Sequence, residues 1–189
     1  MTAVPEALLK LRQEHGNMTL LLDMLERQIA LLREGESADL KTVKGILDYF
    51  LTYPDLVHHP KEDRIYAELK AVRPDQAAGM SRVSEDHRLL AELGNALRAD
   101  IERIIGGDSV RRSKVVGDAS RYIETLRSHM HWEESDLFRR VDRMIQGGHD
   151  TVDTSVVIDS GDPLFGDRIG DRYQRLYDSL VSRQAPTDQ

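Results

Sequence analysis

Apolar residues recur in alternating steps of three and four along most of the chain, and this spacing limits the fold more than any other feature of the sequence. Such spacing places a side chain from nearly every turn on one face of an α-helix. Between Pro5 and Arg33 the positions are Leu8, Leu11, Met18, Leu22, Leu25, Ile29 and Leu32. The same pattern predicts three more long helices, from Ser37 or Asp39 to before Pro74, from Gly79 to Ile105, and from Asp108 or Ser109 to Gly147.

These helices predict an all-α fold, because alternating runs of β-branched residues are nearly absent. Short loops between long amphipathic helices favour an up-down-up-down four-helix bundle over residues 1–147. Pro54 and Pro60 interrupt the second helix, so we expect a kink or short break between Tyr53 and His59.

A polar loop over residues 148–161 follows, and then a C-terminal helix and a short disordered tail over residues 162–189. Asp162 is the expected N-cap of that helix, with Pro163 in its first turn. Its apolar stripe, from Leu164 to Val181, is expected to dock across the end of the bundle. A homodimer contact is the alternative.

Composition excludes several classes of function. The 189 residues contain no cysteine, which excludes disulfides, thiolate catalysis and iron–sulfur ligation by this chain. No apolar run approaches the ~20 residues that span a bilayer. The formal net charge of −7 argues against nucleic acid as a partner. The N-terminal residues lack the features of a secretory signal, so we expect a cytoplasmic location and no membrane partner.

Four histidines fall on the inward faces of the predicted helices, one on each. Counted from the loops at one end of the bundle, His15, His58, His87 and His129 all lie about 18 to 20 residues deep. At a rise of ~1.5 Å per residue, these depths agree to within a few ångströms. The sequence therefore predicts a single layer of imidazoles across the bundle.

Two of these histidines begin a His-x-x-x-Glu segment, ending at Glu62 and at Glu133. Positions i and i+4 share one face of a helix, so both carboxylates join the layer. Burying four imidazoles and two carboxylates without partners is costly, whereas a bound cation removes that cost. Structural histidines and surface ion pairs are the alternative explanation, and the four-way agreement in depth argues against it.

The proposed ligand set, His15, His58, Glu62, His87, His129 and Glu133, contains no sulfur and is too large for one tetrahedral zinc ion. It suits two octahedral ions that Glu62 and Glu133 bridge, with an oxo or hydroxo bridge and exogenous ligands in the remaining positions. Iron fits best, and manganese or a mixed-metal centre is the alternative.

The order H…HxxxE…H…HxxxE resembles the hemerythrin-like (HHE cation-binding) family over about residues 5–147. The segments HHPKED at 58–63 and HMHWEESDLF at 129–138 are similar to those of the family. The resemblance implies a four-helix bundle around a non-haem di-iron site. Unlike the oxygen-carrying members, the third helix has Val83 and Ala91 four positions either side of His87, so one imidazole is missing.

The missing imidazole implies an open or water-filled position at the metal. Within the resemblance, this departure makes the chain similar to bacterial di-iron proteins of the family, which implies that it binds or reacts with O₂, peroxide or NO in a stress or redox response, with a redox partner. Two alternatives remain: a metal-dependent sensor or interaction protein, and iron storage or delivery without turnover. The sequence does not decide whether the chain is an enzyme.

The remaining candidate residues are assigned smaller roles. We expect the other three histidines to face solvent or to lie just outside the ligands as spectators. Asp63 and Glu134 are expected to be solvated carboxylates, and the alternative is that either replaces the ligand before it in the sequence. Two tyrosines lie on the inward faces near the histidine layer, where core packing is favoured over a hydrogen bond to a bridging oxygen. These residues are His59, His131 and His149, with Tyr53 and Tyr122.

Overall fold

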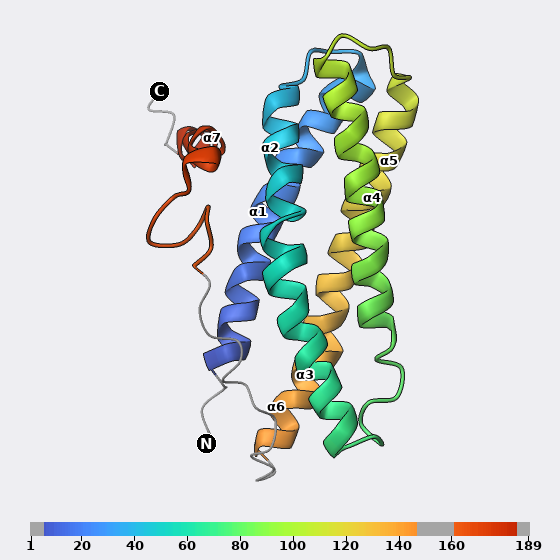
Figure 1. Ribbon diagram of the computed structural model, residues 1–189, viewed down its shortest axis with the longest axis vertical. Coiled ribbons are helices and arrows are strands. Elements are labelled where there is room, and N and C mark those ends of the chain that lie inside the picture. The colour runs from blue at the N-terminus through green and yellow to red at the C-terminus, as the bar shows by residue number, and fades with distance from the viewer. Residues whose placement is uncertain (1–5, 147–160, 185–189) are drawn as a thin grey trace.

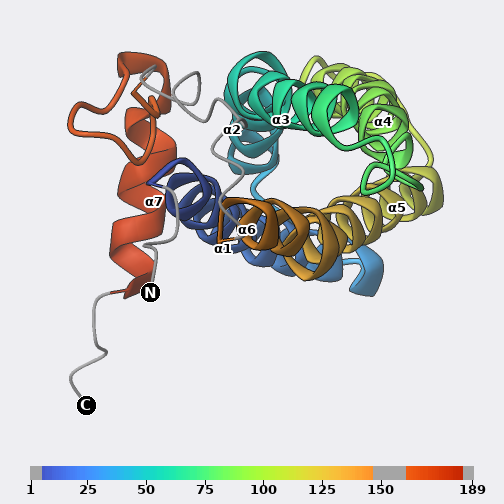
Figure 2. The same cartoon turned by 90° about the horizontal axis from the view of Figure 1, so that it is seen from below.

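The computed structural model describes residues 6–146 and 161–184, and within these ranges it contains helices and no strand. Four antiparallel segments, here called legs, run side by side along the bundle (Figures 1 and 2). The second and the fourth leg are each built from two helices. The predicted all-α, up-down-up-down four-helix bundle is confirmed. The helices of the legs are α1 (Glu6–Glu34), α2 (Leu40–Phe50), α3 (His59–Val72), α4 (Arg82–Ile105), α5 (Arg112–Trp132) and α6 (Phe138–Gln146).

The two composite legs each contain one turn of π-helix, in which a backbone N–H bonds to the carbonyl five residues back. The first turn, η1, spans Pro54–His58 and gives the predicted interruption between Tyr53 and His59. Pro60 accounts for it, because proline has no N–H and clashes with the carbonyl four residues before it. The second turn, η2, spans Glu133–Leu137 and was not predicted. Isolated π-turns of this kind are often found at functional sites.

Buried apolar side chains form two clusters, one toward each end of the bundle. Along α1, Leu8 and Leu11 belong to one cluster, Met18 and Leu22 belong to the other, and His15 lies between them. The same change of cluster occurs once in each of the other legs. A polar layer therefore crosses all four legs at one depth, as the sequence predicts.

Two helix starts differ from the predicted ones. Helix α4 begins at Arg82, because Gly79 has a φ of +77° that no helix accommodates. Helix α5 begins at Arg112 without a side-chain cap. Asp108 does not cap it, since its carboxylate lies 3.4 Å from Nε of Arg103 on the preceding helix.

Asp39, one of the two predicted starts of the second helix, is the N-cap of α2, and its Oδ1 accepts hydrogen bonds from the N–H groups of Lys41 and Thr42. We expect Asp39→Ala to lower the free energy of unfolding by about 1 kcal/mol, because those donors lose their partner. Urea unfolding followed by circular dichroism measures the effect. Glu36→Ala, at an exposed position of the same loop, is the matched control and should change stability by less than half as much.

The C-terminal helix starts later than predicted. Asp162 forms a local turn instead, since its Oδ1 accepts the N–H groups of Leu164 and Phe165. The N–H of Gly170 then bonds back to the carbonyl of Pro163, which closes a compact loop. A 3₁₀ turn, η4 (Asp171–Tyr173), precedes the helix α7 (Gln174–Gln184).

Helix α7 docks on its own chain, as predicted, but it lies against α2 on the outside of the bundle rather than across the end (Figure 2). The hydroxyl groups of Tyr173 and Thr52 are 2.6 Å apart, and Arg175 Nη2 lies 3.3 Å from Asp39 Oδ2. None of the helices within residues 6–146 and 161–184 has the length and hydropathy needed to cross a membrane. The predicted loop 148–161, except Gly161, and the tail 185–189 lie outside the described residues, so the division of the chain stays a prediction.

Candidate metal centre

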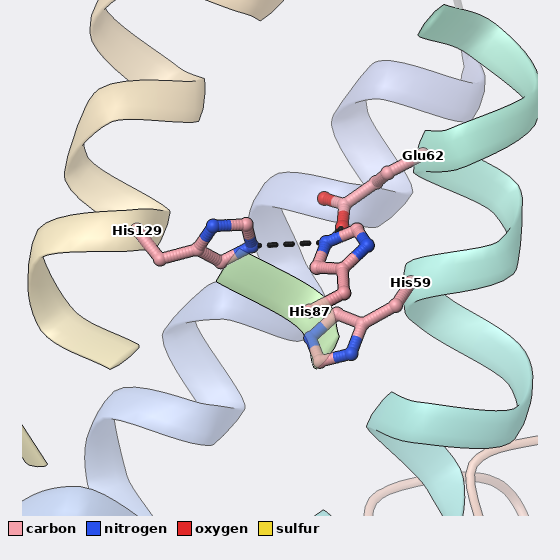
Figure 3. A group of neighbouring side chains, drawn as sticks. All are labelled: His59, Glu62, His87 and His129. Carbon is pink, nitrogen blue, oxygen red and sulfur yellow. Dashed lines mark hydrogen bonds and ion pairs between the residues drawn. The ribbon is translucent and has the colours of Figure 1, made fainter. Parts of the chain in front are cut away.

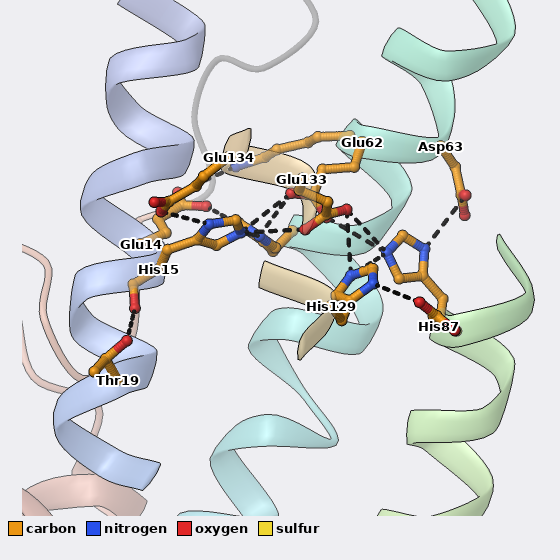
Figure 4. A network of polar contacts seen from close by, with 12 residues as sticks. Glu14, His15, Thr19, Glu62, Asp63, His87, His129, Glu133 and Glu134 are labelled. Carbon is orange, nitrogen blue, oxygen red and sulfur yellow. Dashed lines mark hydrogen bonds and ion pairs between the residues drawn. The ribbon is translucent and has the colours of Figure 1, made fainter. Parts of the chain in front are cut away.

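The polar layer contains two pairs of imidazoles, each formed by one histidine from a single-histidine leg and one from a composite leg. His15 of α1 faces His58, and their Nε2 atoms are 3.1 Å apart. His87 of α4 faces His129 of α5, and their Nε2 atoms are also 3.1 Å apart. All four side chains are buried. The structure thus brings together the four histidines that the sequence places at one depth. Figure 4 labels three of them, His15, His87 and His129.

Both predicted carboxylates lie between the two imidazole pairs. Oε1 of Glu62 is 3.1 Å from Nε2 of His58 and 3.4 Å from that of His15, while its Oε2 is 3.5 Å from Nε2 of His87. Glu133 has the complementary arrangement. Its Oε1 is 3.2 Å from Nε2 of His129, and its Oε2 is 3.5 Å from Nε2 of His15. Each carboxylate therefore presents one oxygen to each pair.

These carboxylates are the strongest indication that the layer holds cations. The side chains of Glu62 and Glu133 are fully buried, and none of their four oxygens accepts a hydrogen bond. An ionised carboxylate in such a place is strongly destabilising unless it is paired or coordinates a metal. Imidazole nitrogens and carboxylate oxygens are also suitable donors for first-row divalent and trivalent metals. The residues present therefore fit a metal centre.

Each of the four imidazoles has a carboxylate next to its Nδ1 atom, on the side of the ring away from Nε2. The distances from Nδ1 to the nearest oxygen are 3.0 Å for His15 and Glu134, 2.5 Å for His58 and Glu14, 3.3 Å for His87 and Asp63, and 3.4 Å for His129 and Asp86. Such partners fix the tautomer so that Nε2 keeps its lone pair for a metal, and they orient the ring.

The four partners of the imidazoles come from positions that sequence reasoning did not single out as functional. Each is adjacent in sequence to a residue of the layer: Glu14 precedes His15, Asp86 precedes His87, Asp63 follows Glu62 and Glu134 follows Glu133. Asp63 and Glu134 are partly exposed, as predicted, and nevertheless contact the imidazoles.

The carboxylates also change the proton affinity of the imidazoles. Burial by itself lowers the pKa of His15, but its contacts with Glu134 and Glu62 outweigh burial and raise the pKa to about 10. For His87, burial again lowers the pKa, and Asp63 and Glu133 raise it to about 11. A metal that binds to these nitrogens has to displace their protons, so its affinity increases with pH.

Glu14 belongs to a small buried network at the outer side of the His15–His58 pair. The hydroxyl of Tyr53 donates to Glu14 Oε1 at 2.8 Å, and Nζ of Lys61 lies 3.5 Å from the same oxygen. Tyr53 therefore contacts the centre through Glu14, a role that core packing does not describe. A pocket lined in part by Lys10, Asn17 and Phe165 reaches Glu14 and Tyr53 from the surface.

Tyr122 and the remaining histidines differ in how well they were predicted. Tyr122 packs against Phe50 at a ring-centroid distance of 5.9 Å, in agreement with core packing. His131 is exposed, as expected. His59 is buried, which excludes the solvent-facing alternative and agrees with a position just outside the ligands. His149 lies outside the described residues.

The model of the hemerythrin HHE cation binding domain matches residues 7–141. The chain belongs to this family. The matched range includes the four histidines of the two pairs, the two carboxylates between them and the four carboxylates beside their Nδ1 atoms. A cluster of buried His and Glu side chains that could hold a metal ion therefore lies within the matched domain. No curated protein and no solved structure matches the chain.

Proposed function

We propose that this HHE-domain chain holds two iron ions, one between His15 and His58 and one between His87 and His129. In this proposal Glu62 and Glu133 each bridge the two ions. The observation that carries the proposal is the set of four buried carboxylate oxygens without hydrogen bonds, two toward each imidazole pair. Manganese or a mixed-metal pair is the alternative occupant.

A pair of iron ions supplies redox chemistry and positions at which small oxidants and gases bind. The residues of the chain limit the access of water and orient the imidazoles. The two apolar clusters, one on each side of the layer, limit the access of water to it. The carboxylates beside the Nδ1 atoms hold the imidazoles in one tautomer. They belong to Glu14, Asp63, Asp86 and Glu134, and Glu14 also accepts a hydrogen bond from the hydroxyl of Tyr53.

We propose that the centre binds or reacts with O₂, peroxide or NO as part of a stress or redox response in the cytoplasm. Its support is the donor set and the resemblance of the sequence, which lacks one imidazole on the third leg. A chain with an open position at the metal can admit a small exogenous ligand there. The proposal includes a redox partner protein for the case in which the protein turns over its oxidant or gas catalytically.

The test begins with iron loading under anaerobic conditions, desalting and elemental analysis. We expect two iron ions per chain in the wild type and in His131→Ala, because His131 is exposed. The loaded protein is then mixed with peroxide, NO or O₂ and followed by stopped-flow absorption. A spectral change with any of the three supports the proposal. An iron content below one per chain, or no reaction with any of them, contradicts it.

A specific set of contacts favours a sensor as the second candidate. Tyr53, which donates to Glu14, stacks on Tyr49 at a centroid distance of 6.0 Å, and Tyr49 donates to Asp162 at 2.8 Å. Contacts therefore run from the partner of His58 to the C-terminal segment. A sensor would bind its gas stoichiometrically and change the exposure of Tyr173, whereas an enzyme would turn over and a storage protein would release iron to a chelator.

A further inference from the structure

His59 is a buried histidine that is neither a ligand nor a partner of a ligand in the metal centre described so far. It begins α3, directly after His58, and is 4 % exposed. Its Nδ1 lies 3.2 Å from Oδ1 of Asp55, one turn earlier. Its Nε2 is buried without a hydrogen-bond partner. A buried nitrogen left unpaired is costly, so this atom requires an explanation.

His59 has the same surroundings as the four imidazoles of the two pairs. A carboxylate lies beside Nδ1 in each case, which places the proton there and leaves the lone pair of Nε2 free. A neutral imidazole with a free Nε2 is the form that binds metals.

The position of His59 is at the His87–His129 pair. Its ring stacks on that of His87 at a centroid distance of 4.1 Å and meets that of His129 edge-on at 5.8 Å (Figure 3). One ligand atom from each of His59, Glu62, His87 and His129 can be chosen so that all four lie within 4.8 Å of one another. That spacing is compatible with a single ion once the His59 ring turns out of its stack on His87, because the in-plane lone pairs of two stacked rings do not meet at one point.

The geometry of the bundle explains how adjacent residues reach different pairs. Neighbouring positions on a helix point about 100° apart. A leg at the corner of a four-helix bundle has neighbours in two such directions, so His58 reaches His15 of α1 while His59 reaches His87 of α4. In the fourth leg the residue after His129 is Met130, which offers no comparable ligand.

We propose that His59 is a third imidazole ligand of the ion between His87 and His129, on the side where the sequence lacks a second histidine in the third leg. The inference rests on the proposed function. It makes the two ions unequal, because the ion between His15 and His58 keeps only two imidazoles. The open position for an exogenous ligand is then at that ion, next to Glu14 and Tyr53.

The experiment uses Co²⁺ as the probe, with metal content, binding isotherms and the visible absorption of the bound ion as readouts. We expect two Co²⁺ per chain in the wild type and in the control His131→Ala. In His59→Ala one ion should bind as in the wild type, and the affinity for the other should fall on the order of 100-fold or more. Added imidazole should restore the second ion and its absorption bands.

Wild-type affinity for both ions and an unchanged spectrum in His59→Ala would overturn the assignment. His59→Gln, which keeps the site filled, guards against a folding defect, and its circular dichroism in chelator should match that of the wild type. If His59 only supports the ring of His87 by stacking, His59→Gln lowers the melting temperature in chelator and binds two Co²⁺ normally. Failure of the proposed function itself looks different, because the wild type then does not bind two Co²⁺ per chain.

Discussion

Glu133→Ala is expected to lower the affinity of the protein for both metal ions, each on the order of 100-fold or more. The reason is that Glu133 presents Oε1 to His87 and His129 and Oε2 to His15, so its removal takes a ligand from each position. Replacing even the partners of metal ligands costs about 10- to 100-fold in affinity, and a direct ligand costs more. Elemental analysis after desalting and competition with a metal indicator measure the loss.

Replacement of one histidine is expected to affect one metal ion, in contrast to the loss of both in Glu133→Ala. His58→Ala removes a nitrogen from only one pair, so we expect it to weaken one ion strongly and to leave the other bound. Glu124→Ala, an exposed carboxylate five positions before His129, is the matched control and should retain two ions. Wild-type iron content in both Glu133→Ala and His58→Ala would show that the ligand assignment is wrong.

The depth of the site was predictable because it depends on helix geometry alone. A fixed rise per residue converts positions in the sequence into heights, and four long helices make an accidental agreement of four heights improbable. The proline interruption was equally readable, since the chemistry of Pro60 acts on its own backbone. The π-turn at Glu133–Leu137 contains no proline or glycine, so no residue in that segment predicts a departure from the α-helix.

The contact of His59 with α4 was not predicted because a single inward face was assumed for each helix. Periodicity identifies one apolar seam, and the residue after His58 falls about 100° away from that seam. In the bundle, that direction leads to α4 rather than to solvent, which only the arrangement of the legs determines. The carboxylates beside the Nδ1 atoms were missed for a similar reason: Glu14 reaches His58 across 44 positions of the chain, and no spacing rule relates the two.

The start of α7 shows a third limit. Asp162 followed by Pro163 is a typical helix start, and the side chain of Asp162 does accept backbone N–H groups as an N-cap would. The N–H of Gly170 bonds back to Pro163, so a loop replaces the expected first turns of a helix. The local signal was correct about the hydrogen bonds and wrong about the element that follows them.

Removal of the metal is expected to lower the melting temperature of the wild type by about 10 °C or more. A ligand at 1,000 times its dissociation constant stabilises the folded chain by about 4 kcal/mol, and in a chain of this size each kcal/mol is worth about 2–4 °C. The structure gives the reason for a large effect, because without a cation two fully buried carboxylates have no hydrogen bonds. Differential scanning calorimetry before and after chelation measures the shift.

The Glu62→Ala/Glu133→Ala double variant separates metal loss from any direct action of the chelator. It has no bridging carboxylate, so we expect it to melt at the same temperature with and without chelator. The change in melting temperature on chelation should be smaller for Glu14→Gln than for the wild type and larger than for the double variant. The reason is that Glu14→Gln weakens the orientation of His58 but leaves every proposed ligand in place. If the wild type loses its iron by elemental analysis and yet melts at an unchanged temperature, the imidazole layer is held by its own ion pairs and the two-ion proposal loses its main physical support.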